Sequence, residues 1–291
     1  MSGTPRLAFD VGGTCARAAV VVNDQIAWRR QCPTPGAHGP AAVVDAMAGL
    51  VAGLETLPDQ VGFAFAGIVA DGRVTAGDDC RFAGFNDVPI GEQLQDRLGR
   101  TVTVMNDARA AAWAEHRHGA GQLSQDMLYI TLSTGVGAGL VLGGRLHTRA
   151  HGLDGELGES PQPDGRNLEA MISGAALGRR GALLGYENSK GVLDAFFAGD
   201  RAAVTLVDPG LEAVARHIGL LRVLLGIELV VLGGSIGLRK DVQRAVEARL
   251  LWLGAKYYVP VVHAALGEDA GLIGAAALAA DRQERAARSV A

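Results

Sequence analysis

The sequence predicts an α/β protein built from two similar halves. Short apolar runs typical of strands alternate along the chain with segments that have the apolar spacing of helices, an order that indicates partly parallel sheets. Two segments, 7–22 and 128–142, share one layout: a strand, a turn rich in glycine and threonine, and a second strand. This repeated layout indicates an internal duplication, so we expect two α/β domains of similar construction.

The first half of the chain accounts for the first domain. Short apolar runs bounded by glycine or polar residues predict strands at 7–10, 18–22, 62–65 and 101–105. Apolar residues at helical spacing, and in the last case an alanine-rich run, predict helices at 40–54, 90–98 and 108–116. A polar stretch with glycine follows, and we expect the domain boundary there, at 118–124.

The second half repeats the alternation and accounts for the second domain. Strands are expected at 128–131, 140–142, 228–232 and 259–264. Helices are expected at 168–184, 211–225, 241–251 and 269–280.

Composition excludes several classes of protein. The net charge is -4 and no basic run is present, so the sequence lacks the electrostatic signature of a nucleic-acid binder. The most apolar stretch, 219–238, is interrupted by Arg222 and Glu228, which excludes a membrane span there. The three cysteines are widely spaced without a CxxC pair, which indicates reduced thiols and a cytoplasmic location.

Two glycine-rich turns are candidate phosphate loops. In Asp10-Val11-Gly12-Gly13-Thr14 the glycines let backbone N–H groups converge on phosphate oxygens, and Asp10 follows a strand, where it is able to hold Mg²⁺ through water. A plain hairpin turn with an Asx cap is the alternative. The second turn, 133–139, resembles a dinucleotide fingerprint, but a strand follows it instead of a helix, so that interpretation fails. Two such loops facing each other would clamp a triphosphate from both sides.

Asn106-Asp107 stands between a predicted strand and a predicted helix. Both residue types are favoured helix N-caps, so capping alone explains one of them. A carboxylate at a helix N-terminus is also kept ionised by the helix dipole, as a base that accepts a hydroxyl proton must be. The sequence leaves both roles open.

The loop 151–159 is rich in glycine and acidic residues. Solvation is the default role of such acids, but Gly155 and Gly158 flank Glu156 closely and permit a ligand to approach. Carboxylates able to accept two hydroxyl hydrogen bonds are typical of sugar sites. Glu169 lies ten residues beyond Glu159 and is a candidate of the same kind.

Taken together, four motifs resemble the ROK family of bacterial sugar kinases and repressors, and their order and spacing run from residue 7 to about residue 280. Within the family the likeness is greatest to the kinases of N-acetylmannosamine. The motifs are Asp10-Val11-Gly12-Gly13-Thr14, Asn106-Asp107-Ala108-Arg109-Ala110-Ala111-Ala112, Ser133-Thr134-Gly135-Val136-Gly137-Ala138-Gly139 and Gly155-Glu156-Leu157-Gly158.

The resemblance implies an actin-like ATPase (ribonuclease H-like) fold with two lobes around a nucleotide and sugar cleft. It implies lobes at 1–118 and 119–275, a C-terminal helix at about 276–291 that packs back on the first lobe, and a homodimer. ATP and Mg²⁺ are the implied cofactors, with Asp10 as the magnesium-binding residue. The implied ATP-binding residues are Asp10, Gly12, Gly13, Thr14, Ser133, Thr134, Gly135, Gly137 and Gly234.

The resemblance also implies a reaction and a sugar site. Asp107 would deprotonate the 6-hydroxyl of the sugar for in-line attack on the γ-phosphate, with positioning and charge neutralisation supplying most of the catalysis. The implied substrate-binding residues are Asn106, Asp107, Glu156, Glu159, Glu169 and Gly67.

The sequence departs from the family pattern where relatives bind a structural zinc. The usual histidine after Gly-Glu-x-Gly is replaced by Glu159, and 160–168 contains none of the usual cysteines. Thiolates are the ligands that make such a site, so we expect no zinc. The sugar loop at 77–84 also differs from the family pattern, and together these changes leave the identity of the sugar substrate open.

The sequence leaves three alternative functions open beside that of an N-acetylmannosamine kinase. A glucokinase-like or other hexose or amino-sugar kinase of the same family is the first. The second is a sugar-responsive repressor, but repressors of the family carry a helix-turn-helix before the first phosphate loop, and here that loop begins at residue 10. A catalytically inactive sensor is the third, although Asp107 and both phosphate loops are intact.

Overall fold

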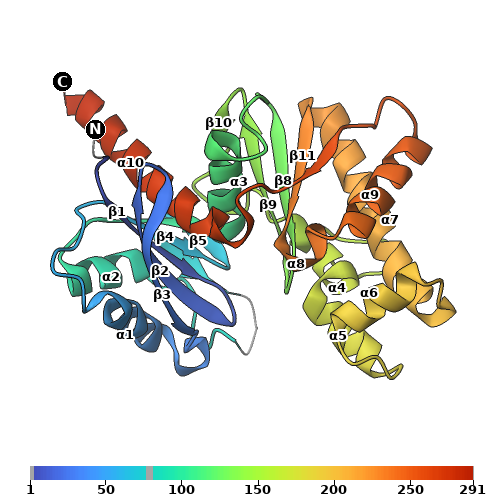
Figure 1. Cartoon of the computed structure of the whole chain (residues 1–291), viewed down its shortest axis with the longest axis horizontal. Coiled ribbons are helices and arrows are strands. Elements are labelled where there is room, and N and C mark those ends of the chain that lie inside the picture. The colour runs from blue at the N-terminus through green and yellow to red at the C-terminus, as the bar shows by residue number, and fades with distance from the viewer. Residues whose placement is uncertain (1–2, 77–80, 291) are drawn as a thin grey trace. The chain divides into compact units, whose positions relative to one another are not determined.

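The computed structural model describes residues 3–76 and 81–290, and it divides the chain into two compact units. The first unit comprises Met1–Ala114, Thr148–Asp154 and Glu268–Ala291, and the second comprises Glu115–His147 and Gly155–Gly267. Relative to the expected lobes, the structure adds the short segment 148–154 to the first unit and begins the returning segment earlier, at Glu268. Each unit contains one five-stranded sheet (Figure 1).

The sheet of the first unit has the order β3-β2-β1-β4-β7. Strand β1 pairs antiparallel with β2 and parallel with β4, and β4 pairs parallel with β7. Parallel neighbours place their carboxyl ends at one edge, so β1 and β7 end on the same side, where they deliver Asp10 and Asn106. The strands are β1 (Arg6–Val11), β2 (Cys15–Val22), β3 (Gln25–Pro33), β4 (Val61–Phe65) and β7 (Val102–Asn106).

Helices cover both faces of this sheet. Along β1, Leu7 and Phe9 pack into a core with α1 (Pro40–Val51) and α2 (Ile90–Leu98), whereas Ala8 lies in a cluster with residues of α10 (Ala270–Val290). This alternation follows from the two-residue period of a strand. In Figure 1, α1 and α2 lie on one side of the sheet and α10 on the other.

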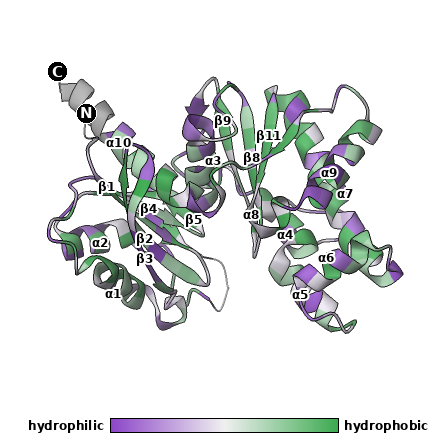
Figure 2. Cartoon of the chain, viewed as in Figure 1, coloured by the Kyte–Doolittle hydropathy of each residue, from purple (hydrophilic) through white to green (hydrophobic). Residues whose placement is uncertain are grey.

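The sheet of the second unit has the order β10-β9-β8-β11-β12, with the same succession of antiparallel and parallel pairings. The internal duplication predicted from the two glycine-rich turns is therefore confirmed. Strands β8 and β11 are mostly hydrophobic, as Figure 2 shows, because helices bury them. The strands are β8 (Met127–Leu132), β9 (Val136–Leu142), β10 (Arg145–Leu146), β11 (Leu229–Gly233) and β12 (Val261–His263).

The core of the second unit lies between this sheet and its two longest helices, α7 and α9, whose apolar residues pack against Leu128, Ile130 and Leu132. Besides α1, α2 and α10, the α-helices of the chain are α3 (Asp107–His118), α4 (Leu168–Ile172), α5 (Gly174–Ala182), α6 (Ser189–Phe197), α7 (Arg201–Leu225), α8 (Gly234–Gly237) and α9 (Lys240–Leu253). The remaining hairpin is β5 (Ile68–Ala70) with β6 (Arg73–Thr75).

Two predicted helices differ from the structure. The helix expected at 168–184 is divided into α4 and α5, because Ser173 is extended and its hydroxyl accepts the N–H of Ala176 as an N-cap. The helix expected at 211–225 begins ten residues earlier, and Pro209 lies inside it. The Pro209-Gly210 pair is typical of a helix end, but here Gly210 packs closely against Ile172 and the helix continues.

The sequence gives no signal for β3 or α6, which the prediction omits. Strand β3 is an edge strand with mostly exposed side chains, so it lacks an apolar run. Among the described residues, we find no helix with the length and hydropathy needed to cross a membrane.

Candidate functional site

The predicted base Asp107 and the predicted substrate-binding residue Asn106 meet at the start of α3, where they have different roles. The side-chain oxygen of Asn106 accepts the N–H of Arg109 at 3.0 Å, which is the N-cap interaction. Its side-chain nitrogen donates to the carbonyl oxygen of Gly67 at 3.0 Å. Asn106 is buried, so these two bonds fix its position and link two predicted sugar-site residues.

Asp107 is the first residue of α3 and is only partly buried. One of its carboxylate oxygens accepts the N–H of the next residue, Ala108, at 2.7 Å. The partial positive charge of a helix N-terminus favours an ionised carboxylate. Capping of α3 falls to Asn106, so the cap and the predicted base are different residues.

The first predicted phosphate loop is a tight turn between β1 and β2. The N–H of Gly12 donates to the carbonyl oxygen of Cys15 at 3.0 Å. Thr34, just beyond β3, binds both sides of the loop. Its hydroxyl donates to the carbonyl oxygen of Gly12, and its N–H donates to the carbonyl oxygen of Thr14. Thr14 itself is exposed. The loop is therefore held from its neighbouring strand, while the side chain of Thr14 stays accessible.

Asp10 is buried at the end of β1 beside this loop. Arg17 on β2 donates to one of its carboxylate oxygens at 2.6 Å, and also to the carbonyl oxygen of Glu268. Burial raises the pKa of Asp10 above its ordinary value, and the charge of Arg17 opposes that rise. The sequence interpretation missed Arg17, whose position opposite Asp10 follows only from the β1–β2 register.

A second arginine near this loop was also missed. A Cβ atom at Gly13 would lie 2.8 Å from a guanidinium nitrogen of Arg81. Glycine at position 13 therefore allows a cation to approach the phosphate loop. Arg81 lies within the predicted sugar loop, 77–84, of which residues 77–80 lie outside the described residues.

The second predicted phosphate loop is held by elements of the second unit. The first N–H groups of α5 donate to it: Gly174 to the carbonyl oxygen of Ser133 at 2.7 Å, and Ala175 to that of Thr134 at 3.1 Å. The hydroxyl of Ser133 lies 3.3 Å from that of Ser235, the residue after Gly234. The structure thus brings the predicted residues Ser133, Thr134 and Gly234 together, and Gly137 follows in β9, opposite Thr131.

Glu169 lies directly against this loop. One of its carboxylate oxygens accepts the N–H of Val136 at 2.8 Å. The same oxygen would lie 2.8 Å from a Cβ atom at Gly135, so glycine is needed there to admit the carboxylate. A residue expected to hold sugar hydroxyls is thereby hydrogen-bonded to the backbone of a loop expected to hold phosphate.

Residues 155–159 of the acidic loop belong to the same unit and lie beside β9. Gly155 has a φ of 85°, and its carbonyl oxygen accepts the N–H of Ala138 at 3.0 Å. A Cβ at Gly158 would lie 2.3 Å from the carbonyl oxygen of Val136. Glu156 is half-buried between these two glycines. Glu159 is exposed and accepts a 3.1 Å hydrogen bond from the side chain of Asn167.

Hydrogen bonds close the segment 160–168, in which no zinc site is expected. The N–H of Leu168 donates to Ser160 at 3.0 Å, that of Gln162 donates to Arg166 at 2.8 Å, and Arg166 forms an ion pair with Asp164. Across 3–76 and 81–290, no three or more His, Cys, Asp or Glu side chains are grouped so as to hold a metal ion.

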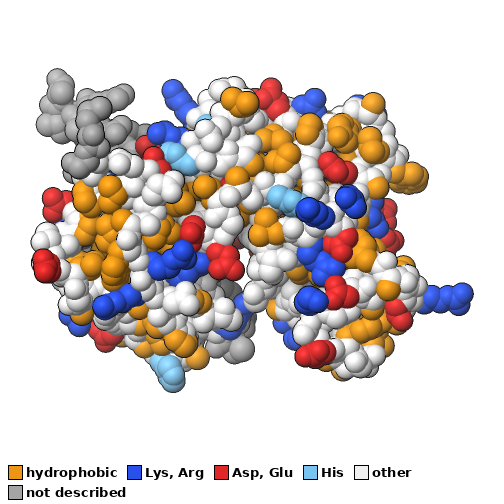
Figure 3. Space-filling view, in the orientation of Figure 1, with side chains coloured by type: hydrophobic (Ala, Val, Ile, Leu, Met, Phe, Trp, Pro, Cys, Tyr) orange, Lys and Arg blue, Asp and Glu red, His pale blue; other side chains and the backbone are white. Residues whose placement is uncertain are grey.

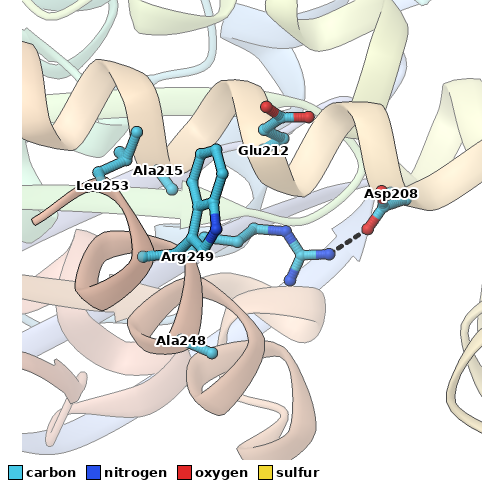
Figure 4. Close-up of a pocket in the computed structure, with 7 residues that line it drawn as sticks. Asp208, Glu212, Ala215, Ala248, Arg249 and Leu253 are labelled. Carbon is cyan, nitrogen blue, oxygen red and sulfur yellow. Dashed lines mark hydrogen bonds and ion pairs between the residues drawn. The ribbon is translucent and has the colours of Figure 1, made fainter.

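A separate hollow of about 310 Å³ lies between α7 and α9 and contains none of the predicted site residues. Figure 4 shows Arg249 reaching across it to an ion pair with Asp208, with Glu212 nearby. An arginine already neutralised by aspartate does not mark an anion site, so this hollow is not a candidate for the ATP or sugar site.

Comparison with known proteins agrees with these motifs. The ROK family model matches residues 6–282. An N-acetylmannosamine kinase of Escherichia coli O1:K1 / APEC is 36% identical over 285 residues, covering 94% of this chain and 97% of the relative. Among solved structures, a ROK hexokinase from Thermus thermophilus is 30% identical with a TM-score of 0.79, covering 97% of this chain and 99% of that one.

A ROK family glucokinase from Streptomyces griseus, solved with glucose and AMPPNP, is also 30% identical, with a TM-score of 0.75 and coverage of 95% of this chain and 99% of that one. These likenesses extend over both units, and they confirm the expected actin-like ATPase fold. The family model and the full-length relatives together show that this chain belongs to the ROK family.

Proposed function

We propose that this chain is an ATP-dependent kinase that phosphorylates N-acetylmannosamine at its 6-hydroxyl, a step in sialic acid breakdown. The identity of 36% with an N-acetylmannosamine kinase over nearly the whole chain supports this substrate. The structural observation that carries the proposal is the start of α3, where Asn106 caps the helix and the carboxylate of Asp107 lies at the helix N-terminus.

In the proposed reaction, Asp107 takes the proton of the 6-hydroxyl while that oxygen attacks the γ-phosphorus of ATP. The bond from the γ-phosphorus to the bridging oxygen breaks, and ADP leaves. Asn106, held by Gly67, and the carboxylates of Glu156, Glu159 and Glu169 bind the other sugar groups. The sugar is thereby oriented for attack, and orientation is a large part of the rate enhancement.

The two glycine-rich turns hold the proposed ATP-binding residues, Gly12, Gly13 and Thr14 in the first turn and Ser133, Thr134, Gly135 and Gly137 in the second, together with Gly234. Asp10 fits an indirect contact with Mg²⁺: Arg17 occupies one carboxylate oxygen, which leaves the other oxygen for a water-mediated contact. Bound Mg²⁺ supplies neutralisation of the triphosphate charge.

We expect the enzyme to work without zinc, because hydrogen bonds and the Asp164–Arg166 ion pair already close the segment 160–168. Metal analysis of the purified protein should find no stoichiometric zinc. After treatment with a chelator, Mg²⁺ alone should restore full activity at an unchanged Tm. Zinc bound at one ion per chain, or activity recovered only with Zn²⁺, would contradict this expectation.

A glucose-phosphorylating enzyme is the second candidate. Glu159 replaces the histidine of the family pattern, and the Streptomyces griseus relative is a glucokinase solved with glucose. A coupled ADP-release assay with N-acetylmannosamine, N-acetylglucosamine, glucose, mannose and fructose decides between them. We expect the highest kcat/KM for N-acetylmannosamine. A higher kcat/KM for glucose would replace the leading proposal, and no ADP release with any sugar would favour a sensor.

We further propose a cytoplasmic homodimer. Exposed apolar side chains on α7 and α9 of the second unit include Leu224, Leu251 and Trp252. Figure 3 shows hydrophobic patches on the surface of this unit. Exposed apolar side chains grouped on adjacent helices are typical of protein–protein contacts. A second copy of the chain is the proposed partner.

A further inference from the structure

A buried ion pair lies in the first unit, outside the predicted site. A guanidinium nitrogen of Arg109 lies 3.2 Å from a carboxylate oxygen of Asp154, and the two side chains are only 2% and 4% exposed. The other terminal nitrogen of Arg109 donates to the carbonyl oxygen of Gly152 at 2.7 Å. The second oxygen of Asp154 accepts the N–H of Arg149 at 3.0 Å. Both charges are therefore paired and further hydrogen-bonded.

The pair joins two segments that matter for the proposed reaction. Arg109 lies in the first turn of α3, two residues after Asp107, and its own N–H is the group that Asn106 caps. Asp154 ends the segment Thr148–Asp154, and two residues later in the chain comes Glu156. Arg109 thus holds Asp154, the residue from which the acidic loop continues to Glu156.

Residues 148–151 and 153 of the segment are exposed, and one close backbone contact adds to the ion pair. Gly152, with a φ of 68°, lies against β5, where a Cβ would come within 2.3 Å of the carbonyl oxygen of Val69. Leu153, its large apolar residue, is 58% exposed and contributes little burial. An ion pair, rather than a hydrophobic anchor, therefore fixes the segment.

Buried ion pairs add little net stability, because desolvation of the charges offsets their attraction, but they demand one geometry. A buried ion pair is therefore suited to an active site, where small displacements of the reacting groups lower the rate strongly. Burial of both charges next to Asp107 is therefore better explained by positioning than by stability.

We propose that Arg109 and Asp154 are positioning residues for the kinase reaction. They clamp the segment 148–154 onto the helix turn that carries Asp107, and so fix the point from which the chain continues to Glu156. Neither residue contacts a substrate. This inference rests on the proposed sugar kinase activity.

The variant Asp154→Asn tests the proposal, because asparagine keeps the shape and an acceptor oxygen for Arg149 but removes the charge. With the sugar that the wild-type protein phosphorylates best, we expect kcat/KM to fall about 10- to 100-fold. Most of that loss should be a higher KM for the sugar, with the KM for ATP changed by less than about twofold. A merely structural pair would lower the folded fraction, which reduces the apparent kcat and leaves KM unchanged.

Asp24→Asn is the matched control, because it breaks the part-buried Arg6–Asp24 ion pair of the same unit by the same chemical change. It should leave both KM values unchanged. The double variant Arg109→Gln/Asp154→Asn replaces the ion pair with two amides, leaves no buried unpaired charge and should fold even if the single variant does not. We expect it to keep a raised KM for the sugar.

A wild-type sugar KM in the folded Asp154→Asn and double variants overturns the inference and leaves the proposed function intact. Failure of both variants to fold also overturns it, since the pair would then be a folding determinant. A wild-type protein that phosphorylates none of the five sugars would instead overturn the proposed function, and this inference with it.

Discussion

At the scale of single residues, the proposed activity depends on how Asn106 and Asp107 share the start of α3. Capping requires one side-chain oxygen aimed at the N–H of the helix's first turn, and Asn106 supplies it. An asparagine caps without adding a charge, so the carboxylate that follows is the one anion in this turn. The order Asn-Asp, rather than Asp-Asn, therefore places the base on the helix side of the cap.

The variant Asp107→Asn tests this division of roles. It should lower kcat by about 10²- to 10⁴-fold, because the amide cannot accept the hydroxyl proton. Calorimetry in the absence of ATP should give a sugar affinity close to that of the wild type, since the amide retains hydrogen-bonding capacity. Asp45→Asn, on the exposed side of α1, is the control and should have wild-type kinetics. A variant at position 107 with more than a tenth of wild-type kcat would exclude Asp107 as the base.

At the scale of elements, α10 packs on the first sheet through small residues. A Cβ at Gly62 on β4 would lie 2.0 Å from the carbonyl oxygen of Ala275, and one at Gly274 would lie 1.8 Å from that of Ala110 on α3. Neighbouring contacts on this face come from Ala8, Ala64 and Ala276. The glycine and alanine content of the helix is thus a packing requirement, because backbones approach each other more closely than a larger side chain permits.

Two glycine-to-alanine variants in helices should therefore have opposite effects. Gly274→Ala forces a methyl group against the backbone of α3 and should lower the free energy of unfolding by about 1–3 kcal/mol. Gly49→Ala in α1 places its methyl group in open space and should raise that free energy by about 0.5–1 kcal/mol, because alanine favours the helix. Urea unfolding followed by circular dichroism measures both. Equal effects of the two changes would refute this account of the packing.

At the scale of the whole molecule, each unit repeats one sheet order but covers it differently. The first sheet is covered by α1, α2 and α10, whereas the second is packed by the longer α7 and α9. The outer sides of α7 and α9 expose Leu220, Leu224, Leu251 and Trp252, with Trp252 82% exposed. Such a surface is costly in water and is explained by the proposed dimer.

Size-exclusion chromatography with light scattering tests the dimer. The wild-type protein should have twice the chain mass of 30.1 kDa, and the double variant Leu224→Asp/Trp252→Asp should have the chain mass itself. Charges introduced at both positions would be desolvated in an apolar interface, which is unfavourable. Leu183→Asp changes an equally exposed leucine after α5 and should remain dimeric. A monomeric wild-type protein at micromolar concentration would contradict the proposal.

The amino-acid sequence by itself determined the α/β class, the duplication and the motifs of the candidate site, because these depend on local patterns: apolar periodicity, glycine in turns and acids beside them. Helix α2 matches its predicted bounds, Ile90–Leu98, for this reason. Edge strand β3 and the continuation of α7 through Pro209 depend on neighbours far along the chain, so local patterns missed them.

Only the tertiary structure decided which charged residues are partners. Arg109 and Glu115 are both charged residues of the alanine-rich helix α3, and the sequence does not show what either one contacts. In the structure Arg109 pairs with Asp154, whereas Glu115 is fully buried and accepts the N–H groups of Ala265 and Leu266. Likewise, Arg17 meets Asp10 through strand register, and Glu169 meets Val136 across the fold. These contacts join residues distant in sequence. For Arg109, Asp154 and Glu115, burial makes a partner obligatory, because an unpaired charge in the interior is too costly to keep.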